Sequence, residues 1–174
     1  VLEKTELNPV SNYGVLKAFE EIQIKQLSEK FNIGTIIARI FNITGPNEPE
    51  RMVGGAFVSQ LIKGNTLEVG NLFPKRDFLD IRDAADALKV LGIKGKSGNV
   101  YNICSGKSIS IEDYLNLIIK NIKCSPQIKE SSDRINKTEI DDLVGDNYKL
   151  KQLGWKANYP LDQTVKDLIK SYRN

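Results

Sequence analysis

The order of apolar and polar residues along the chain predicts a succession of helices and strands. Between residues 11 and 31, apolar side chains recur at close to helical spacing, which predicts a helix with Ser11 or Asn12 as its cap. The β-branched run TIIARIF (35–41) predicts a strand buried on both faces, and NITGPNEP (42–49) is typical of a turn. A buried strand that ends in a polar loop is the order expected at the ligand-binding edge of a sheet.

The same alternation continues to the end of the chain. Ser110 with Asp113 is typical of a capping box, in which the acid binds the free amide of the serine. Because helices and strands alternate, the predicted fold class is α/β. The further elements are expected in this order: a helix at about 52–63, a short strand at 66–69, an extended segment at 76–81, a helix from near Asp83 to Leu91, a strand at 98–104, a helix from Ser110 to about Lys123, a polar loop at 125–145, a short helix from Asp146 to Gly154, and a helix from Leu161 to Tyr172.

The composition is that of a folded protein. The 174 residues favour one domain, with 40% hydrophobic and 27% charged residues. The net charge is +3 and the lysines are scattered, which favours an anionic small ligand over nucleic acid. The longest apolar stretch contains Arg39, so we expect no membrane-spanning helix. Cys104 and Cys124 form neither a C-x-x-C motif nor a disulfide framework, which favours a reducing cytoplasm.

Two absences narrow the chemistry. The chain has no histidine, which excludes Ser-His-Asp and Cys-His nucleophilic sites and most zinc sites. Acid–base chemistry therefore depends on Tyr, Lys, Asp, Glu or Cys. The sequence also contains no G-x-G-x-x-G after a strand, and it opens close to a predicted helix. We expect it to be the later part of a longer protein.

Tyr13 and Lys17 form the most informative pair in the sequence. Positions four residues apart on a helix lie one above the other, so both side chains can meet one ligand. A phenol has a pKa of about 10, and a neighbouring ammonium favours the phenolate. Such a pair can exchange a proton with a hydroxyl or carbonyl group at neutral pH. The alternative is a partly exposed helix pair that stabilises the helix by a few tenths of a kcal/mol.

Five ordered segments, which together cover nearly the whole chain, carry a resemblance to a known family: NPVSNYGVLK (8–17), ARIFNITGP (38–46), GNLFPKRDFLDIRDAADAL (70–88), GNVYNICSGKSISIEDYL (98–115) and GDNYKLKQLGW (145–155). They resemble the extended short-chain dehydrogenase/reductases, the NAD(P)-dependent nucleotide-sugar epimerases, dehydratases and reductases. They look most like the branch of GDP-6-deoxy-mannose reductase and GDP-mannose 4,6-dehydratase, and RDFLDIRD leans toward the reductase.

The resemblance implies a fold and its division. The chain would be the C-terminal part of a Rossmann-like enzyme. Residues 1–50 would end the Rossmann-like domain and include the Tyr/Lys helix. Residues 51–174 would form mostly the substrate-binding subdomain, with 77–104 returning to the sheet. The resemblance also implies a homodimer through the Tyr/Lys helix, with simple core packing of its wide apolar arc as the alternative.

The resemblance also implies roles for single residues. Tyr13 would be the general acid/base, and Lys17 would tune it and hold the nicotinamide ribose of NAD or NADP. Asn42 would contact the substrate, with an Asx-turn as the alternative or additional role. Arg76 would grip the diphosphate of the nucleotide sugar, to which its planar fork can donate two hydrogen bonds.

A nucleotide contact is implied for Arg134 and Glu139, which lie where relatives carry an R-P-x-D or R-P-x-E pattern. This chain departs from that pattern, because alignment on Gly145 places Asn136 and Lys137 at the Arg and Pro positions. Arg134 or Lys137 would then supply the positive charge, and the nucleotide preference stays open.

The leading hypothesis for function is part of an NAD(P)-dependent nucleotide-sugar oxidoreductase, dehydratase or epimerase, acting on a GDP-4-keto-6-deoxy-mannose-type or related sugar. Hydride would move between nicotinamide and a sugar carbon while Tyr13 moves the proton. Asp77 and Asp83 are expected to be structural partners or helix caps. The alternative is a catalytically inactive nucleotide-sugar binding fragment or scaffold.

Overall fold

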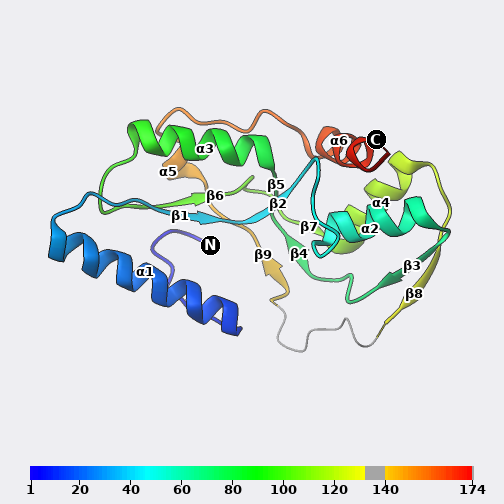
Figure 1. Cartoon of the computed structure of the whole chain (residues 1–174), viewed down its shortest axis with the longest axis horizontal. Helices are drawn as coiled ribbons and strands as arrows, with labels where there is room; N and C mark the ends of the chain where they lie inside the picture. Colours follow the sequence, from blue (N-terminus) through cyan, green and yellow to red (C-terminus); the bar gives the residue numbers. More distant parts are fainter. Residues whose placement is uncertain (132–139, 174) are drawn as a thin grey trace.

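The computed structural model describes residues 1–131 and 140–173. Its elements alternate between helix and strand, as the sequence predicts, and Figure 1 shows them along an elongated molecule. In chain order they are α1 Asn12–Phe31, β1 Ile37–Ile40, β2 Asn42–Thr44, α2 Val53–Lys63, β3 Thr66–Val69, β4 Lys75–Arg76, β5 Phe78–Asp80, α3 Ile81–Lys94, β6 Val100–Ile103, β7 Ile109–Ser110, α4 Ile111–Ile122, β8 Gln127–Glu130, β9 Asp142–Leu143, α5 Tyr148–Lys151 and α6 Leu161–Arg173.

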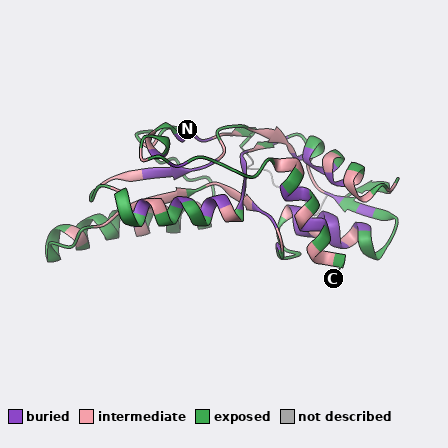
Figure 2. Cartoon of the chain, turned by 90° about the horizontal axis from the view of Figure 1, so that it is seen from above, coloured by how far each residue is buried: buried purple, intermediate pink, exposed green. Residues whose placement is uncertain are grey.

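One half of the molecule is a helix–strand–helix arrangement. β1 and β6 pair in parallel, with α3 on one side of them and α1 on the other (Figure 1). α3 packs Ala87 and Leu91 into a hydrophobic cluster with Tyr101 of β6, Leu150 of α5 and the indole of Trp155. α1 has no part in this cluster and is mostly exposed (Figure 2).

The other half has a second hydrophobic cluster. α2, α4 and α6 pack together beside the parallel pair of β3 and β8. Val58, Leu67, Ile118, Val165 and Leu168 are fully buried there, with relative exposures of 0%. Full burial of each such aliphatic side chain stabilises the fold by about 1.5–3 kcal/mol, so this cluster is a substantial core.

Short strands join the two halves. β2 pairs in parallel with β5, and β4 pairs with β7 and β9. Because successive side chains of a strand point to opposite faces, Phe78 of β5 enters the α2/α4/α6 cluster while Leu79 enters the α3 cluster. Asp80 then caps α3 by accepting a hydrogen bond from the Arg82 N–H at 2.8 Å. A single strand therefore belongs to both cores.

Several expected boundaries and caps are confirmed. Ser11 is the N-cap of α1, and the Ser110 hydroxyl oxygen accepts the Asp113 N–H at 2.9 Å. The capping box is incomplete, since the Ser110 hydroxyl itself donates to the Asp113 carboxylate at 2.7 Å. α3 begins at Ile81, before the expected Asp83, because Asp80 provides its cap.

Two expectations were wrong. The strand expected at 35–41 is not buried on both faces: β1 covers only Ile37–Ile40, and Ile40 is 43% exposed. Within the described residues β1 pairs on one edge only, with β6. The polar loop expected at 125–145 contains β8 and β9, whose partners lie far away in the sequence. None of the helices in the described parts of the chain combines the length and apolar character that a membrane span requires.

Candidate active site

The start of α1 places Tyr13 and Lys17. Ser11 is extended, with φ −140° and ψ 157°, and its side-chain oxygen accepts the Gly14 N–H at 3.1 Å. This bond satisfies one of the free amides of the first turn. A Cβ on Gly14 would lie 3.2 Å from the Cβ of Pro9, so the small residue lets the entering chain fold back closely. The helix therefore begins one residue before Tyr13.

Tyr13 and Lys17 share one face of α1, as their spacing predicts. The Lys17 ammonium lies 5.7 Å from the centroid of the Tyr13 ring, within the range of a cation–π contact. Tyr13 is 70% exposed, so its hydroxyl is open to a ligand. The geometry allows one small molecule to touch both side chains.

Glu20 is a third member of this group that the sequence reasoning missed. Lys17 donates a hydrogen bond to the Glu20 carboxylate at 2.8 Å, and this bond raises the pKa of Lys17 above its ordinary value. The positive charge beside Tyr13 is thereby kept. The i,i+3 spacing of Lys17 and Glu20 was a readable signal for the pair.

α1 is held to β1 by a partly buried ion pair. Arg39 of β1 donates two hydrogen bonds to the Glu21 carboxylate, at 3.0 and 2.8 Å, and a third to the Glu3 carbonyl at 2.9 Å. Burial alone would raise the pKa of Glu21, but the hydrogen bonds and charges of Arg39 and Lys25 hold it below the ordinary value. Glu21 is the one buried residue of α1, so this contact sets the position of the helix.

Asn42 opens β2, next to Phe78 in the register of the β2–β5 pair. Its side chain forms no hydrogen bond with the other described residues, so the Asx-turn expected as an alternative or additional role does not form there. Asn42 is partly buried.

The loop after β2 is fixed by a buried polar network that sequence reasoning missed. The Thr44 hydroxyl lies 2.7 Å from a Glu48 carboxylate oxygen and 2.6 Å from the Tyr114 hydroxyl, and the second Glu48 oxygen accepts the Gly54 N–H at 2.9 Å. Burial raises the pKa of Glu48 and of Tyr114. The network ties the loop that follows Asn42 to α2 and α4.

Arg76 lies on β4, one of the strands that join the two halves. Its guanidinium donates to the carbonyl oxygens of Lys75 and Ile140, at 2.8 and 2.7 Å. Arg134 and Glu139, the other expected nucleotide contacts, lie outside the described residues. The structure thus brings Tyr13 and Lys17 together on α1 and places Asn42 and Arg76 on the central strands.

The structural roles expected for Asp77 and Asp83 are confirmed. Both are fully buried, and Asp83 accepts the backbone N–H groups of Asn158 and Tyr159 at 2.8 and 3.0 Å. Asp77 likewise accepts hydrogen bonds from backbone N–H groups. Within the described parts of the chain, no group of three or more acidic or cysteine side chains could hold a metal ion.

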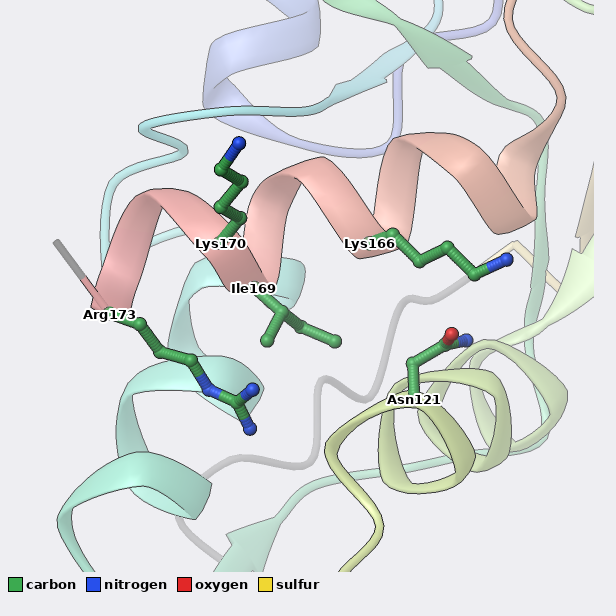
Figure 3. Close-up of a pocket in the computed structure, with 5 residues that line it drawn as sticks. All are labelled: Asn121, Lys166, Ile169, Lys170 and Arg173. Carbon is green, nitrogen blue, oxygen red and sulfur yellow. The ribbon is translucent and has the colours of Figure 1, made fainter.

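Two cavities lie away from Tyr13 and Lys17. The larger, of about 570 Å³, is lined by residues of β5, of the loop after β6 and of the segment before α6, including Lys107 and Tyr159. The smaller, of about 230 Å³, lies between α4 and α6. Its basic side chains point in different directions, and Lys170 points away from Asn121 (Figure 3). Neither cavity is lined by a residue expected in the active site.

Comparison with known proteins agrees with the resemblance. A model of the family described as GDP-mannose 4,6 dehydratase matches residues 1–168. The GDP-6-deoxy-D-mannose reductase of Pseudomonas aeruginosa is 26% identical over 174 residues, covering 96% of this chain and 57% of the relative. The dTDP-D-glucose 4,6-dehydratase of Mus musculus is 25% identical over 177 residues, covering 98% of this chain and 50% of the relative.

Solved structures show the same fold. The RMD protein of Pseudomonas aeruginosa, complexed with NADPH, superimposes with a TM-score of 0.91 at 26% identity, covering 99% of this chain and 60% of that chain. A mutant UDP-glucuronic acid 4-epimerase from Bacillus cereus, in complex with UDP-4-deoxy-4-fluoro-glucuronic acid and NAD, has a TM-score of 0.93 at 22% identity, covering 99% of this chain and 56% of that chain. The expected fold class is confirmed, and the chain spans between half and 60% of the length of these proteins.

Proposed function

The chain belongs to the GDP-mannose 4,6-dehydratase family, and on this premise we propose that it is part of an NAD(P)-dependent nucleotide-sugar oxidoreductase. The observation that carries the proposal is the open pair on α1, in which the Lys17 ammonium lies 5.7 Å from the Tyr13 ring centroid. The proposed substrate is a GDP-4-keto-6-deoxy-mannose-type or related nucleotide sugar. The RDFLDIRD segment and the reductase relative favour reduction over dehydration.

The residues of α1 fit one end of NAD(P). An exposed phenol beside an ammonium can hold the two hydroxyls of a nicotinamide ribose, and the 70% exposure of Tyr13 leaves room for it. The relative complexed with NADPH supports this cofactor class. When bound, the cofactor would supply or accept hydride.

The chain's own residues would bind the substrate and move a proton. Tyr13 would donate its phenolic proton to the oxygen of the keto group during reduction, or remove a hydroxyl proton in the reverse direction. Lys17, kept charged by Glu20, would stabilise the phenolate that remains. Asn42 and Arg76 would bind the sugar and the diphosphate, since an amide and a planar guanidinium suit these groups.

The two separate hydrophobic clusters support a division of the chain into a cofactor-binding part and a substrate-binding part. The strands and helices of residues 1–50 and 77–104 would form the end of the cofactor-binding layer, and most of 51–174 would form the substrate-binding subdomain. β1 pairs on one edge only within the described residues, and parallel strands are normally buried in a larger sheet. We therefore expect a cofactor-binding half to pair with β1.

The apolar side chains of α1 support a homodimer. Leu16, Phe19, Ile22 and Leu27 are each more than half exposed, at 53%, 53%, 51% and 52%. A helix that is apolar around much of its surface is normally covered on more than one side. A second copy of the protein, paired through α1, would cover this surface.

A turnover assay tests the proposal. The protein that joins this chain to its cofactor-binding half should oxidise NADPH in the presence of GDP-4-keto-6-deoxy-mannose, followed by the loss of NADPH absorbance. No turnover with this or another keto sugar nucleotide, together with tight nucleotide-sugar binding, would favour the inactive binding protein instead. The 174-residue chain alone should bind NADP poorly, because its sequence contains no glycine-rich pyrophosphate loop. Micromolar binding by isothermal titration would contradict this last expectation.

A further inference from the structure

Asp77 is a fully buried carboxylate between β4 and β5. One oxygen accepts the N–H and the hydroxyl of Ser105, at 2.7 and 2.6 Å. The other accepts the N–H groups of Gly106 and Gly145, at 2.9 and 3.2 Å. An ionised carboxylate offers about four acceptor positions, and these donors fill them. A buried charge is tolerated when hydrogen bonds compensate it in this way.

The four donors come from two segments that are distant in sequence. Ser105 and Gly106 follow β6, whereas Gly145 follows β9. The backbone at Gly145 passes so close to its neighbours that an added Cβ would lie 2.5 Å from the Cys104 sulfur. Asp77 is therefore the point at which the ends of β6 and β9 meet the strand that carries Arg76.

Arg76 and its neighbours hold the β9 segment along its length. The Arg76 guanidinium donates to the Ile140 carbonyl at 2.7 Å, and the Lys75 N–H donates to the Asp141 carbonyl at 2.7 Å. The Asp77 N–H donates to the Leu143 carbonyl at 3.1 Å. Asp77 directly follows Arg76 in the chain, so its hydrogen bonds anchor the same stretch of backbone that carries the Arg76 side chain.

We propose that Asp77 is a positioning residue for nucleoside-diphosphate binding by Arg76. It fixes the backbone of β4 against the ends of β6 and β9, and so sets the direction in which the Arg76 guanidinium is presented. The inference rests on the proposed function, because it concerns the site where Arg76 meets the substrate diphosphate. Asp77 itself is buried and does not touch the ligand.

The structure offers a matched control for loss of a buried carboxylate. Asp83 is as fully buried as Asp77 and also accepts backbone N–H groups, from Asn158 and Tyr159. It lies on α3, not beside Arg76. Asp77→Asn and Asp83→Asn each exchange a charged acceptor for an amide. If only Asp77→Asn lowers ligand affinity, the cause is the position of this carboxylate next to Arg76 and not the general loss of stability that follows from removing a buried carboxylate.

The test is isothermal titration of the 174-residue chain with GDP, UDP and dTDP, using Arg76→Ala to show that binding depends on the guanidinium. We expect Asp77→Asn to weaken binding of the preferred nucleotide by at least about tenfold, since small displacements of a binding group are costly. Asp83→Asn should stay within about twofold of wild type, because additivity holds between distant sites. Amide exchange at Gly106 and Gly145 should accelerate in Asp77→Asn only.

Each outcome decides between the proposals. If Arg76→Ala weakens binding but Asp77→Asn does not, or if Asp83→Asn weakens it equally, Asp77 is only structural. If wild type binds none of the three nucleotides, Arg76 holds no nucleoside diphosphate in this chain and the inference is overturned, whereas the proposed function is decided separately by the turnover assay of the joined protein. If Asp77→Asn does not fold, Ser105→Ala replaces it, because it removes one donor and leaves three. A smaller loss of affinity, of at least about threefold, is then expected, and wild-type affinity would overturn the inference.

Discussion

Thr164 joins α6 to the strand shared by both cores through one buried hydroxyl. The hydroxyl lies 2.7 Å from the Asp80 carboxylate and 3.2 Å from the Pro160 carbonyl, so its hydrogen goes to the carboxylate. Thr164→Val keeps the shape of the side chain and removes this donor. A hydrogen bond to a charged group contributes about 1.5–3 kcal/mol. Asp80 keeps its hydrogen bonds from Arg82, so we expect the loss to stay in this range.

Urea denaturation followed by the fluorescence of Trp155, the one tryptophan of the chain, measures this loss. Thr164→Ser is the matched control, because it keeps the hydroxyl and removes a methyl group worth about 1 kcal/mol. The valine variant should therefore be less stable than the serine variant. A valine variant within about 0.5 kcal/mol of wild type, the ordinary effect of a neutral substitution, would refute the reasoning. So would a serine variant that is the less stable of the two.

Three further predictions concern α1 and the loop after β2. Glu20→Gln removes the carboxylate that raises the pKa of Lys17, so NMR titration should show a lower Lys17 pKa; an unchanged value would contradict the pairing. Burial raises the pKa of Glu48 above its ordinary value of 4.5, so the folded protein holds the Glu48 proton more tightly than the unfolded chain does. The contribution of Glu48 to stability therefore falls as pH rises from 4.5 through the raised pKa. The Glu48→Gln variant lacks this pH-dependent loss of stability. In urea titrations, the free energy of unfolding of the variant minus that of wild type should therefore rise from acidic to neutral pH. A difference that does not change with pH would count against the buried network. Phe19→Asp should abolish the proposed homodimer in sedimentation equilibrium, because it places a charge within the exposed apolar face of α1; a dimer mass equal to that of wild type would argue against an interface centred on Phe19.

Local signals in the sequence predicted the helices best. The cap at Ser11 and the cap at Ser110 each depend on residues within three positions, and both form. β8 and β9 were missed because each is short and polar and pairs with a strand far away in the sequence. β1 has the composition of a fully buried strand, yet within the described residues it pairs on one edge only. The sequence pattern predicts how deeply a strand can be buried, but it does not predict which neighbouring strands pair with it.

The candidate site shows the same limit. Spacing alone placed Tyr13 and Lys17 on one face of a helix. The contacts of Asp77 with Ser105, Gly106 and Gly145, and the contact of Thr44 with Tyr114, could not be predicted, because they join residues that are 28 to 70 positions apart in the sequence. Such contacts depend on how the strands are ordered, which no local pattern encodes.

The kcat of Tyr13→Phe tests the central claim most directly, in the protein that joins this chain to its cofactor-binding half. Tyr13 is exposed and lies on the first turn of α1, so the substitution removes a hydroxyl without disturbing a core. If this phenol transfers the proton, kcat should fall by about 10²–10⁴-fold while the affinity for the nucleotide sugar changes little. A phenylalanine variant that turns over at the wild-type rate would contradict the account.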